Sequence, residues 1–160
     1  MTIKIGDKIP SITLTKVVDG APDQVQSDDF FADRTVALFA VPGAFTPTCS
    51  ARHLPSFVDH AQDLKTKGVD EIACIAVNDA FVMDAWGKQN GTDGKVTLLS
   101  DGNGAFAKAI GLDFDASKFG MGTRAQRFSM LVENGMVTQL NVEQPGAYEV
   151  SSAEHLLGQL

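Results

Sequence analysis

The sequence lacks the features that mark membrane proteins, nucleic-acid-binding proteins and disulfide-stabilised proteins. Its 160 residues include only two cysteines, and the formal net charge is −7. No apolar run approaches the ~18 residues of a transmembrane helix. Lys and Arg do not cluster as a nucleic-acid surface requires. The sequence therefore predicts neither a membrane partner nor a nucleic-acid partner.

Three further absences narrow the class of protein. No CxxC motif is present, which disfavours an ordinary dithiol exchanger. Residues 1–7 have neither the apolar core of a signal peptide nor the Arg/Ser-rich character of a transit peptide. We therefore expect a cytoplasmic protein, and in a reducing compartment two cysteines indicate chemistry more than structure. Repeats and Ser/Pro-rich linkers are missing, so we expect a single domain over residues 1–160.

Alternating apolar strands and amphipathic helices predict an α/β fold. The predicted strands cover residues 12–18, 35–41, 71–77, 96–99, 127–132 and 136–142. The predicted helices cover residues 47–67, a segment capped by Asn78-Asp79, residues 104–110 and residues 152–160. In the capped helix we expect an inner face of Phe81, Val82, Ala85 and Trp86. This order predicts a three-layer sandwich around a mixed central sheet, with function at the carboxyl ends of the strands.

The segment Pro42-Gly43-Ala44-Phe45-Thr46-Pro47-Thr48-Cys49 is the strongest local signal. It follows a buried strand, and Thr46 and Pro47 suit the N-cap and first position of a helix. Cys49 then lies in the first turn, where free N–H groups and the helix dipole favour a thiolate. The alternative is a buried hydrophobic cysteine. The capped helix start favours a reactive Cys49.

Several weaker candidates have simple structural alternatives. Residues 101–107 form a GxGxxA pattern, but it comes too late in the chain for a dinucleotide site and favours a turn with a helix cap. His53 and His60 share a helix face with Cys49 and could hold zinc, although His53 also fits the apolar stripe. Cys74 lies inside a strand and is typical of a buried thiol, unless Cys49 comes within disulfide reach.

Two arginines, Arg124 and Arg127, lie at the start of the strand that contains Phe128. Arginines in such positions usually reach solvent. The alternative is that one of them holds an anionic or polar substrate near Cys49, where its permanent charge also favours the thiolate.

Taken together, these motifs resemble the type II peroxiredoxins, the peroxiredoxin-five subfamily, over almost the whole chain. The active-site pattern is present as Pro42, Thr46 and Cys49 within Pro-Gly-Ala-Phe-Thr-Pro-Thr-Cys-Ser. His53-Leu54-Pro55, residues 73–83 and Arg127-Phe128-Ser129-Met130 also match. The resemblance implies a thioredoxin-like fold and a thiol peroxidase that acts on hydrogen peroxide and alkyl hydroperoxides.

The resemblance also assigns expected roles. Cys49 would be the peroxidatic cysteine, with Thr46, Pro42 and Arg127 around it and Cys74 as a possible resolving cysteine. The substrate pocket would include Gly43, Phe45, Phe119 and Arg124. Glutathione, glutaredoxin or thioredoxin would reduce the oxidised Cys49, with no metal, haem or flavin cofactor, and the protein would be a homodimer. The alternatives are a thiol–disulfide oxidoreductase or redox sensor on the same fold, and a non-enzymatic domain in which Cys49 is structural.

Overall fold

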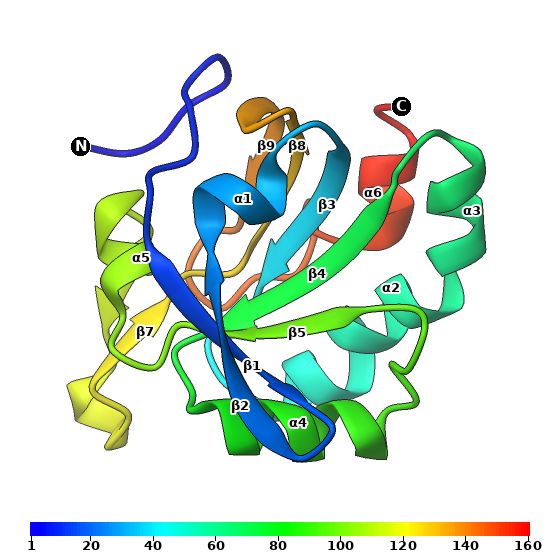
Figure 1. The fold of residues 1–160 in the computed structure, drawn as a ribbon. Helices are drawn as coiled ribbons and strands as arrows, with labels where there is room; N and C mark the ends of the chain where they lie inside the picture. The colour runs from blue at the N-terminus through cyan, green and yellow to red at the C-terminus, as the bar shows by residue number, and fades with distance from the viewer.

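The computed structural model describes all residues from 1 to 160 and is built on one mixed, seven-stranded sheet in the order β2-β1-β5-β4-β3-β8-β9 (Figure 1). The strands are β1 (Thr13–Val18), β2 (Ala21–Gln26), β3 (Thr35–Ala40), β4 (Glu71–Ala76), β5 (Thr97–Ser100), β8 (Phe128–Glu133) and β9 (Met136–Val142). The central β3, β4 and β5 run parallel, and β8 pairs antiparallel with β3. The carboxyl end of β3 therefore lies beside the start of β8.

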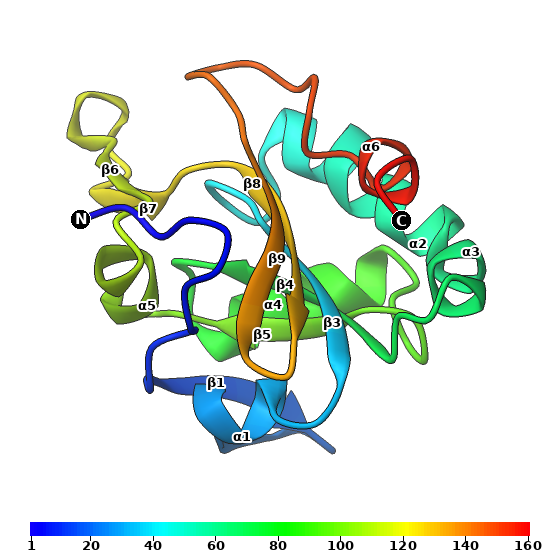
Figure 2. The same cartoon turned by 90° about the horizontal axis from the view of Figure 1, so that it is seen from above.

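Helices cover both faces of this sheet. They are α1 (Ser27–Phe31), the π-helix η1 (Cys49–His53), α2 (Leu54–Asp59), α3 (Ala61–Thr66), α4 (Ala80–Gln89), α5 (Ala105–Ala109), the 3₁₀-helix η2 (Ser117–Phe119) and α6 (Ala153–Leu157). Figure 2 shows α2, α3 and α6 together on one side, with α1 and α5 away from them. No helix has the length and apolar character needed to cross a bilayer.

The alternation of side chains along β3 explains the two apolar cores. Leu38 packs with the residues of α1 and α5, whereas Phe39 packs with those of α2, α3, α4 and α6. Since successive strand residues point to opposite faces, a continuously apolar strand needs cover on both sides. The predicted three-layer α/β arrangement with a mixed sheet is confirmed.

The structure corrects three details of the predicted elements. The inner face of α4 is formed by Ala80, Met83, Trp86 and Gly87, whereas Phe81 is 61% exposed. The long helix after the cysteine motif is divided into η1, α2 and α3, with a break at His60. A small hairpin, β6 (Asp113–Asp115) and β7 (Thr123–Ala125), was not predicted, because its strands are too short to show an apolar period.

Candidate active site

The turn that carries Cys49 follows β3 directly and starts as predicted, but it is wider than an α-helix. Helical backbone begins at Pro47, and residues Cys49–His53 form a π-helix in which the Leu54 N–H donates to the Cys49 carbonyl. Pro55 gives a physical reason, because it has no N–H for the Ala51 carbonyl and its ring crowds that position. The cysteine side chain is fully buried in this wide turn.

Thr46 occupies the predicted N-cap position, but its hydroxyl does not form the predicted cap. The Ser50 N–H donates to the Thr46 carbonyl at 2.9 Å, which is the first bond of the helix. The Thr46 hydroxyl instead donates to the Gly43 carbonyl at 2.6 Å. The prediction of a side-chain cap was therefore wrong. The hydroxyl oxygen keeps its lone pairs for a hydrogen-bond donor such as a peroxide O–H.

Arg127 is the cation beside the sulfur. Arg127 lies immediately before β8, and Phe128 pairs with Ala40 at the end of β3. The Arg127 side chain therefore reaches the cysteine turn that follows β3. Its Nη2 donates to Cys49 Sγ at 3.1 Å. No carboxylate forms an ion pair with Arg127. Its positive charge is therefore available to a thiolate and to oxygen that gains negative charge.

His53 holds the other side of that guanidinium. Arg127 Nη1 donates to His53 Nδ1 at 2.9 Å, and His53 Nε2–H donates to the Ser151 carbonyl at 2.9 Å. Burial, and then the charge of Arg127, lower the pKa of His53 from 6.5 to about 3. The ring is therefore neutral at physiological pH, with its proton on Nε2.

This geometry leaves neither nitrogen of His53 free to bind zinc. Both ring nitrogens are occupied by hydrogen bonds, and His60 contacts the Ser56 carbonyl and the Glu154 carboxylate instead. The role of His53 as the acceptor for Arg127 was missed. The available signal was a histidine four residues after the cysteine, but its partner comes from a strand far along the chain.

Two more contacts fix the turn against its neighbours. The Trp86 indole N–H donates to the Ser50 hydroxyl at 2.9 Å. The Ala44 N–H donates to the Asn78 side chain at 2.9 Å, which joins the loop to the end of β4. Since Trp86 is fully buried on α4, the turn cannot open without breaking a bond to the core.

Pro42, Gly43 and Arg124 meet at the rim of the turn. Arg124 donates to the Met121 carbonyl at 2.8 Å and to the Pro42 carbonyl at 3.4 Å. A Cβ on Gly43 would lie 3.2 Å from Arg124 Nη1 and from Thr46 Cγ2. This close approach explains why a glycine occupies the position. Arg124 is therefore placed near the predicted pocket, although it does not contact the sulfur.

The two predicted aromatic walls lie on the surface. Phe45 is 49% exposed and has a positive φ of 66°. Phe119 is 67% exposed on η2, with the Lys118 ammonium 5.1 Å from its ring centre. Neither ring is part of the two apolar cores. Their contact with substrate stays a prediction.

Cys74 lies on β4 with its side chain in the same apolar core as Cys49. Both cysteines are free and buried. Burial raises the pKa of the Cys74 thiol well above its usual value, and the nearby Cys49 acts in the same direction while Arg127 opposes it. Cys74 is thus a protonated core thiol in this conformation, whereas Cys49 has a guanidinium beside it.

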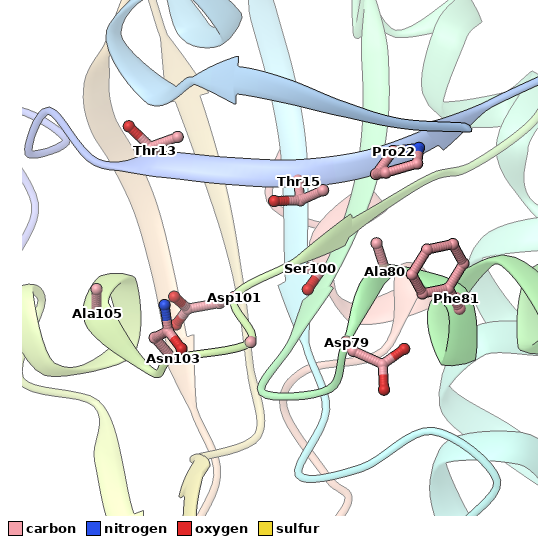
Figure 3. A pocket seen from close by; sticks show the side chains of 11 residues that line it. Thr13, Thr15, Pro22, Asp79, Ala80, Phe81, Ser100, Asp101, Asn103 and Ala105 are labelled. Atoms are coloured by element: carbon pink, nitrogen blue, oxygen red, sulfur yellow. The ribbon is translucent and has the colours of Figure 1, made fainter.

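Two clefts of the surface contain none of the predicted site residues. A cleft of about 280 Å³ lies beside β1 and the starts of α4 and α5 (Figure 3), and another of about 530 Å³ lies along the other end of α4. In the first, Asp101 accepts from the Phe106 and Ala107 N–H groups and Asp79 accepts from Val82 N. The GxGxxA pattern is therefore a turn and helix cap, as the simpler interpretation predicted.

A thioredoxin-like α/β fold with one thiol held against a guanidinium defines a thiol-based redox protein. The comparisons agree with this class. A sequence model of the redoxin family matches residues 4–157. The chain is 48% identical to the chloroplastic peroxiredoxin-2E-2 of Oryza sativa subsp. japonica over 98% of its own length and 72% of that protein.

Other relatives agree over the full domain. Peroxiredoxin-2D of Arabidopsis thaliana is 44% identical, with 97% of this chain and 96% of that protein covered. The structure of reduced Prx3 from Vibrio vulnificus in complex with hydrogen peroxide has a TM-score of 0.95 and 46% identity, with 99% of each chain covered. The chain belongs to the redoxin family and, within it, to the peroxiredoxins of the type II, peroxiredoxin-five kind. It is a thiol-dependent peroxidase, an oxidoreductase that reduces peroxides.

Proposed function

We propose that Cys49 is the peroxidatic nucleophile and that Arg127 stabilises charge on the reacting atoms. The observation that carries this proposal is the 3.1 Å contact from Arg127 Nη2 to Cys49 Sγ. This guanidinium has no carboxylate partner, so its N–H donors and its charge are available to the sulfur and to the peroxide. The complex of the Vibrio vulnificus relative with hydrogen peroxide supports the same substrate class here.

The proposed reaction transfers one peroxide oxygen to sulfur. The Cys49 thiolate attacks that oxygen, the S–O bond forms and the O–O bond breaks. The sulfur is oxidised by two electrons to sulfenic acid, and the peroxide is reduced. The second oxygen leaves with the electron pair of the broken bond and takes a proton from solvent to become water or an alcohol. Arg127 offers N–H donors to the oxygen that becomes negative.

Thr46 and Pro42 have supporting roles in this proposal. Since the Thr46 hydroxyl donates to Gly43, it presents lone pairs to the site and can accept the O–H of a hydroperoxide. This contact would orient the substrate rather than stabilise the leaving oxygen. Pro42 is half-buried beside the turn and limits the access of water to the sulfur. Orientation and electrostatics together must supply most of the rate.

The oxidised Cys49 is reduced by an external thiol in our proposal, from glutathione, glutaredoxin or thioredoxin. The reductant attacks the sulfenic acid, forms a mixed disulfide and releases water, and a second thiol then restores Cys49. Cys74 is an optional partner, because its raised thiol pKa and full burial make it a poor nucleophile. Since Cys49 is also fully buried, a protein thiol needs the η1 turn to open first.

We also propose a homodimer through the face that carries Phe45 and Phe119, and a cytoplasmic location. Two aromatic rings that are 49% and 67% exposed favour a partner surface. Two free cysteines suit a reducing compartment. Sedimentation at micromolar concentration tests the first proposal, since a 17.0 kDa species alone would contradict it. Fractionation of the source cells tests the second.

One experiment separates the peroxidase role of Cys49 from the alternatives. Pre-reduced protein is mixed with stoichiometric hydrogen peroxide, and free thiols are counted within about a second. We expect rapid loss of one thiol in the wild type and in Cys74→Ser, and none in Cys49→Ser. A disulfide exchanger would keep its thiols under these conditions, and a structural cysteine would not react. Normal peroxidase activity in Cys49→Ser would overturn the assignment.

A further inference from the structure

A buried carboxylate, Glu143, lies next to Arg127 just beyond the end of β9 and has no role in the mechanism above. Phe128 pairs with Val142 across β8 and β9, so the next residues on either side, Arg127 and Glu143, are also neighbours. The Glu143 N–H donates to the Arg127 carbonyl at 3.0 Å. Glu143 is only 6% exposed and forms no ion pair. A lone buried carboxylate is costly, so its contacts need an explanation.

The Glu143 carboxylate is held entirely by the loop that follows it. It accepts from the N–H groups of Glu149 at 2.9 Å, Val150 at 2.9 Å and Ser151 at 2.8 Å, and from the Ser151 hydroxyl at 2.6 Å. Although burial opposes ionisation, these hydrogen bonds lower the pKa of Glu143 below its usual value. The charged carboxylate therefore gathers residues 149–151 into one fixed conformation.

That conformation sets the position of the Ser151 carbonyl, which is the acceptor for His53 Nε2–H at 2.9 Å. The bond places the imidazole proton on Nε2 and leaves Nδ1 as an acceptor for Arg127 Nη1 at 2.9 Å. Because Nη1 of the guanidinium is held by His53, Nη2 is directed at Cys49 Sγ. The contacts form an unbroken chain from Glu143 to the sulfur.

We propose that Glu143 is a positioning residue for the peroxidase reaction, which acts through the 149–151 loop and His53 to hold Arg127 against Cys49. The proposal rests on the roles given above to Cys49 and Arg127. The carboxylate touches neither substrate nor sulfur. It lowers the freedom of the guanidinium, so that the donor is already oriented when negative charge develops on the leaving oxygen.

The structure indicates why a carboxylate is needed at this position. All four donors bond to the same oxygen of Glu143, Oε2, and the Glu149 N–H also lies 3.0 Å from Oε1. A glutamine that keeps its oxygen at these four donors would place its NH₂ group against the Glu149 N–H. The loop would then have to move, and the Ser151 carbonyl with it. The imidazole of His53 would lose its fixed tautomer, and Arg127 its acceptor.

The test uses the full-length Glu143→Gln variant and Glu71→Gln as its matched control. Glu71 also accepts hydrogen bonds, from Arg34 and Thr97, but it lies at the amino end of β4, away from the cysteine. Two quantities are measured: the second-order rate constant for oxidation of Cys49 by hydrogen peroxide, and the imidazole ¹⁵N shifts of His53. The NMR measurement does not depend on activity.

For Glu143→Gln we expect the rate constant to fall about 10- to 100-fold, since misplacement by about 1 Å costs up to that much. The His53 shifts should change from the Nε2–H form to an exchanging mixture. Glu71→Gln should stay within about twofold of wild type and keep the His53 spectrum. Glu143→Asp keeps the charge on a shorter side chain, and we expect intermediate values for both quantities.

Three results would overturn the proposal. They are a wild-type rate in Glu143→Gln, an equal loss of rate in Glu71→Gln, and a loss of rate with the His53 spectrum unchanged. If Glu143→Gln does not fold, Glu143→Asp carries the test, and a wild-type rate with altered His53 shifts would count against the proposal. Failure of the nucleophile assignment is recognised separately, by activity in Cys49→Ser.

Discussion

The neutral, buried His53 makes a definite prediction about how the stability of the protein depends on pH. The unfolded chain takes up a proton on this imidazole near pH 6.5, whereas the folded protein does so only near pH 3. Between these values the unfolded state binds more protons. The neutral His53 ring therefore makes its full contribution to the free energy of unfolding above about pH 7. This contribution is lost progressively as the pH falls.

The size of the effect follows from these two pKa values. Between pH 7.5 and 5.0 the linkage relation gives a loss of about 2 kcal/mol in the free energy of unfolding. The result needs only that the folded-state pKa of His53 lies well below 5. The charged groups that face the ring are Arg127, which lowers its pKa, and Glu143, which raises it less.

The assay is urea unfolding of reduced wild type and His53→Gln at pH 7.5, 6.0 and 5.0. Glutamine does not titrate, so the variant should be less stable at pH 7.5 but should lose about 2 kcal/mol less on acidification. All other ionisable groups are common to both proteins, so the difference between their pH dependences isolates His53. Equal pH dependence in the two proteins would refute the reasoning, because it would mean that His53 is not kept neutral by folding.

Four more predictions concern the cysteine turn and its neighbours. Arg127→Lys cannot hold Cys49 and His53 together, so stopped-flow oxidation by hydrogen peroxide should slow roughly 10²-fold; an unchanged rate would remove Arg127 from the mechanism. Thr46→Val loses the bond to Gly43 and should cost about 1 kcal/mol in urea unfolding as well as rate, and a fully stable variant would contradict this. Cys74→Ala should turn over almost normally with glutathione and glutaredoxin. Loss of turnover, with a Cys49–Cys74 disulfide trapped in the wild type, would contradict this. Ser50→Ala leaves the indole of the only tryptophan without its 2.9 Å acceptor, so the emission of the reduced protein should shift; an identical spectrum would argue against the tie between η1 and α4.

Local sequence signals predicted most of the elements correctly. The predicted strands 127–132 and 136–142 are joined by Asn134-Gly135, because both residues accept the positive φ that a tight hairpin needs, and they have φ values of 48° and 77°. The start of the cysteine helix at Pro47 was predicted because a proline there loses no hydrogen bond. These signals depend on neighbouring residues only, which is why they can be recognised without a structure.

Side-chain directions were less predictable. The inner face of α4 was assigned to Phe81, Val82, Ala85 and Trp86, but the core covers Met83 and leaves Phe81 exposed. The hydroxyl of Thr46 was expected to cap a helix, and it bonds to the Gly43 carbonyl instead. In both cases the residue type fits two environments. The choice depends on the surroundings that folding brings to it.

Residues 42–49 already predict a reactive cysteine, because a helix start with Thr46 and Pro47 follows a buried strand in consecutive residues. The partners of that cysteine come from elsewhere. Arg127 reaches it because β8 pairs with β3, and Glu143 lies beside Arg127 because β9 pairs with β8. Strand order depends on the packing of both faces of the sheet, so only the tertiary structure could decide that a neutral histidine and a buried glutamate stand behind the arginine.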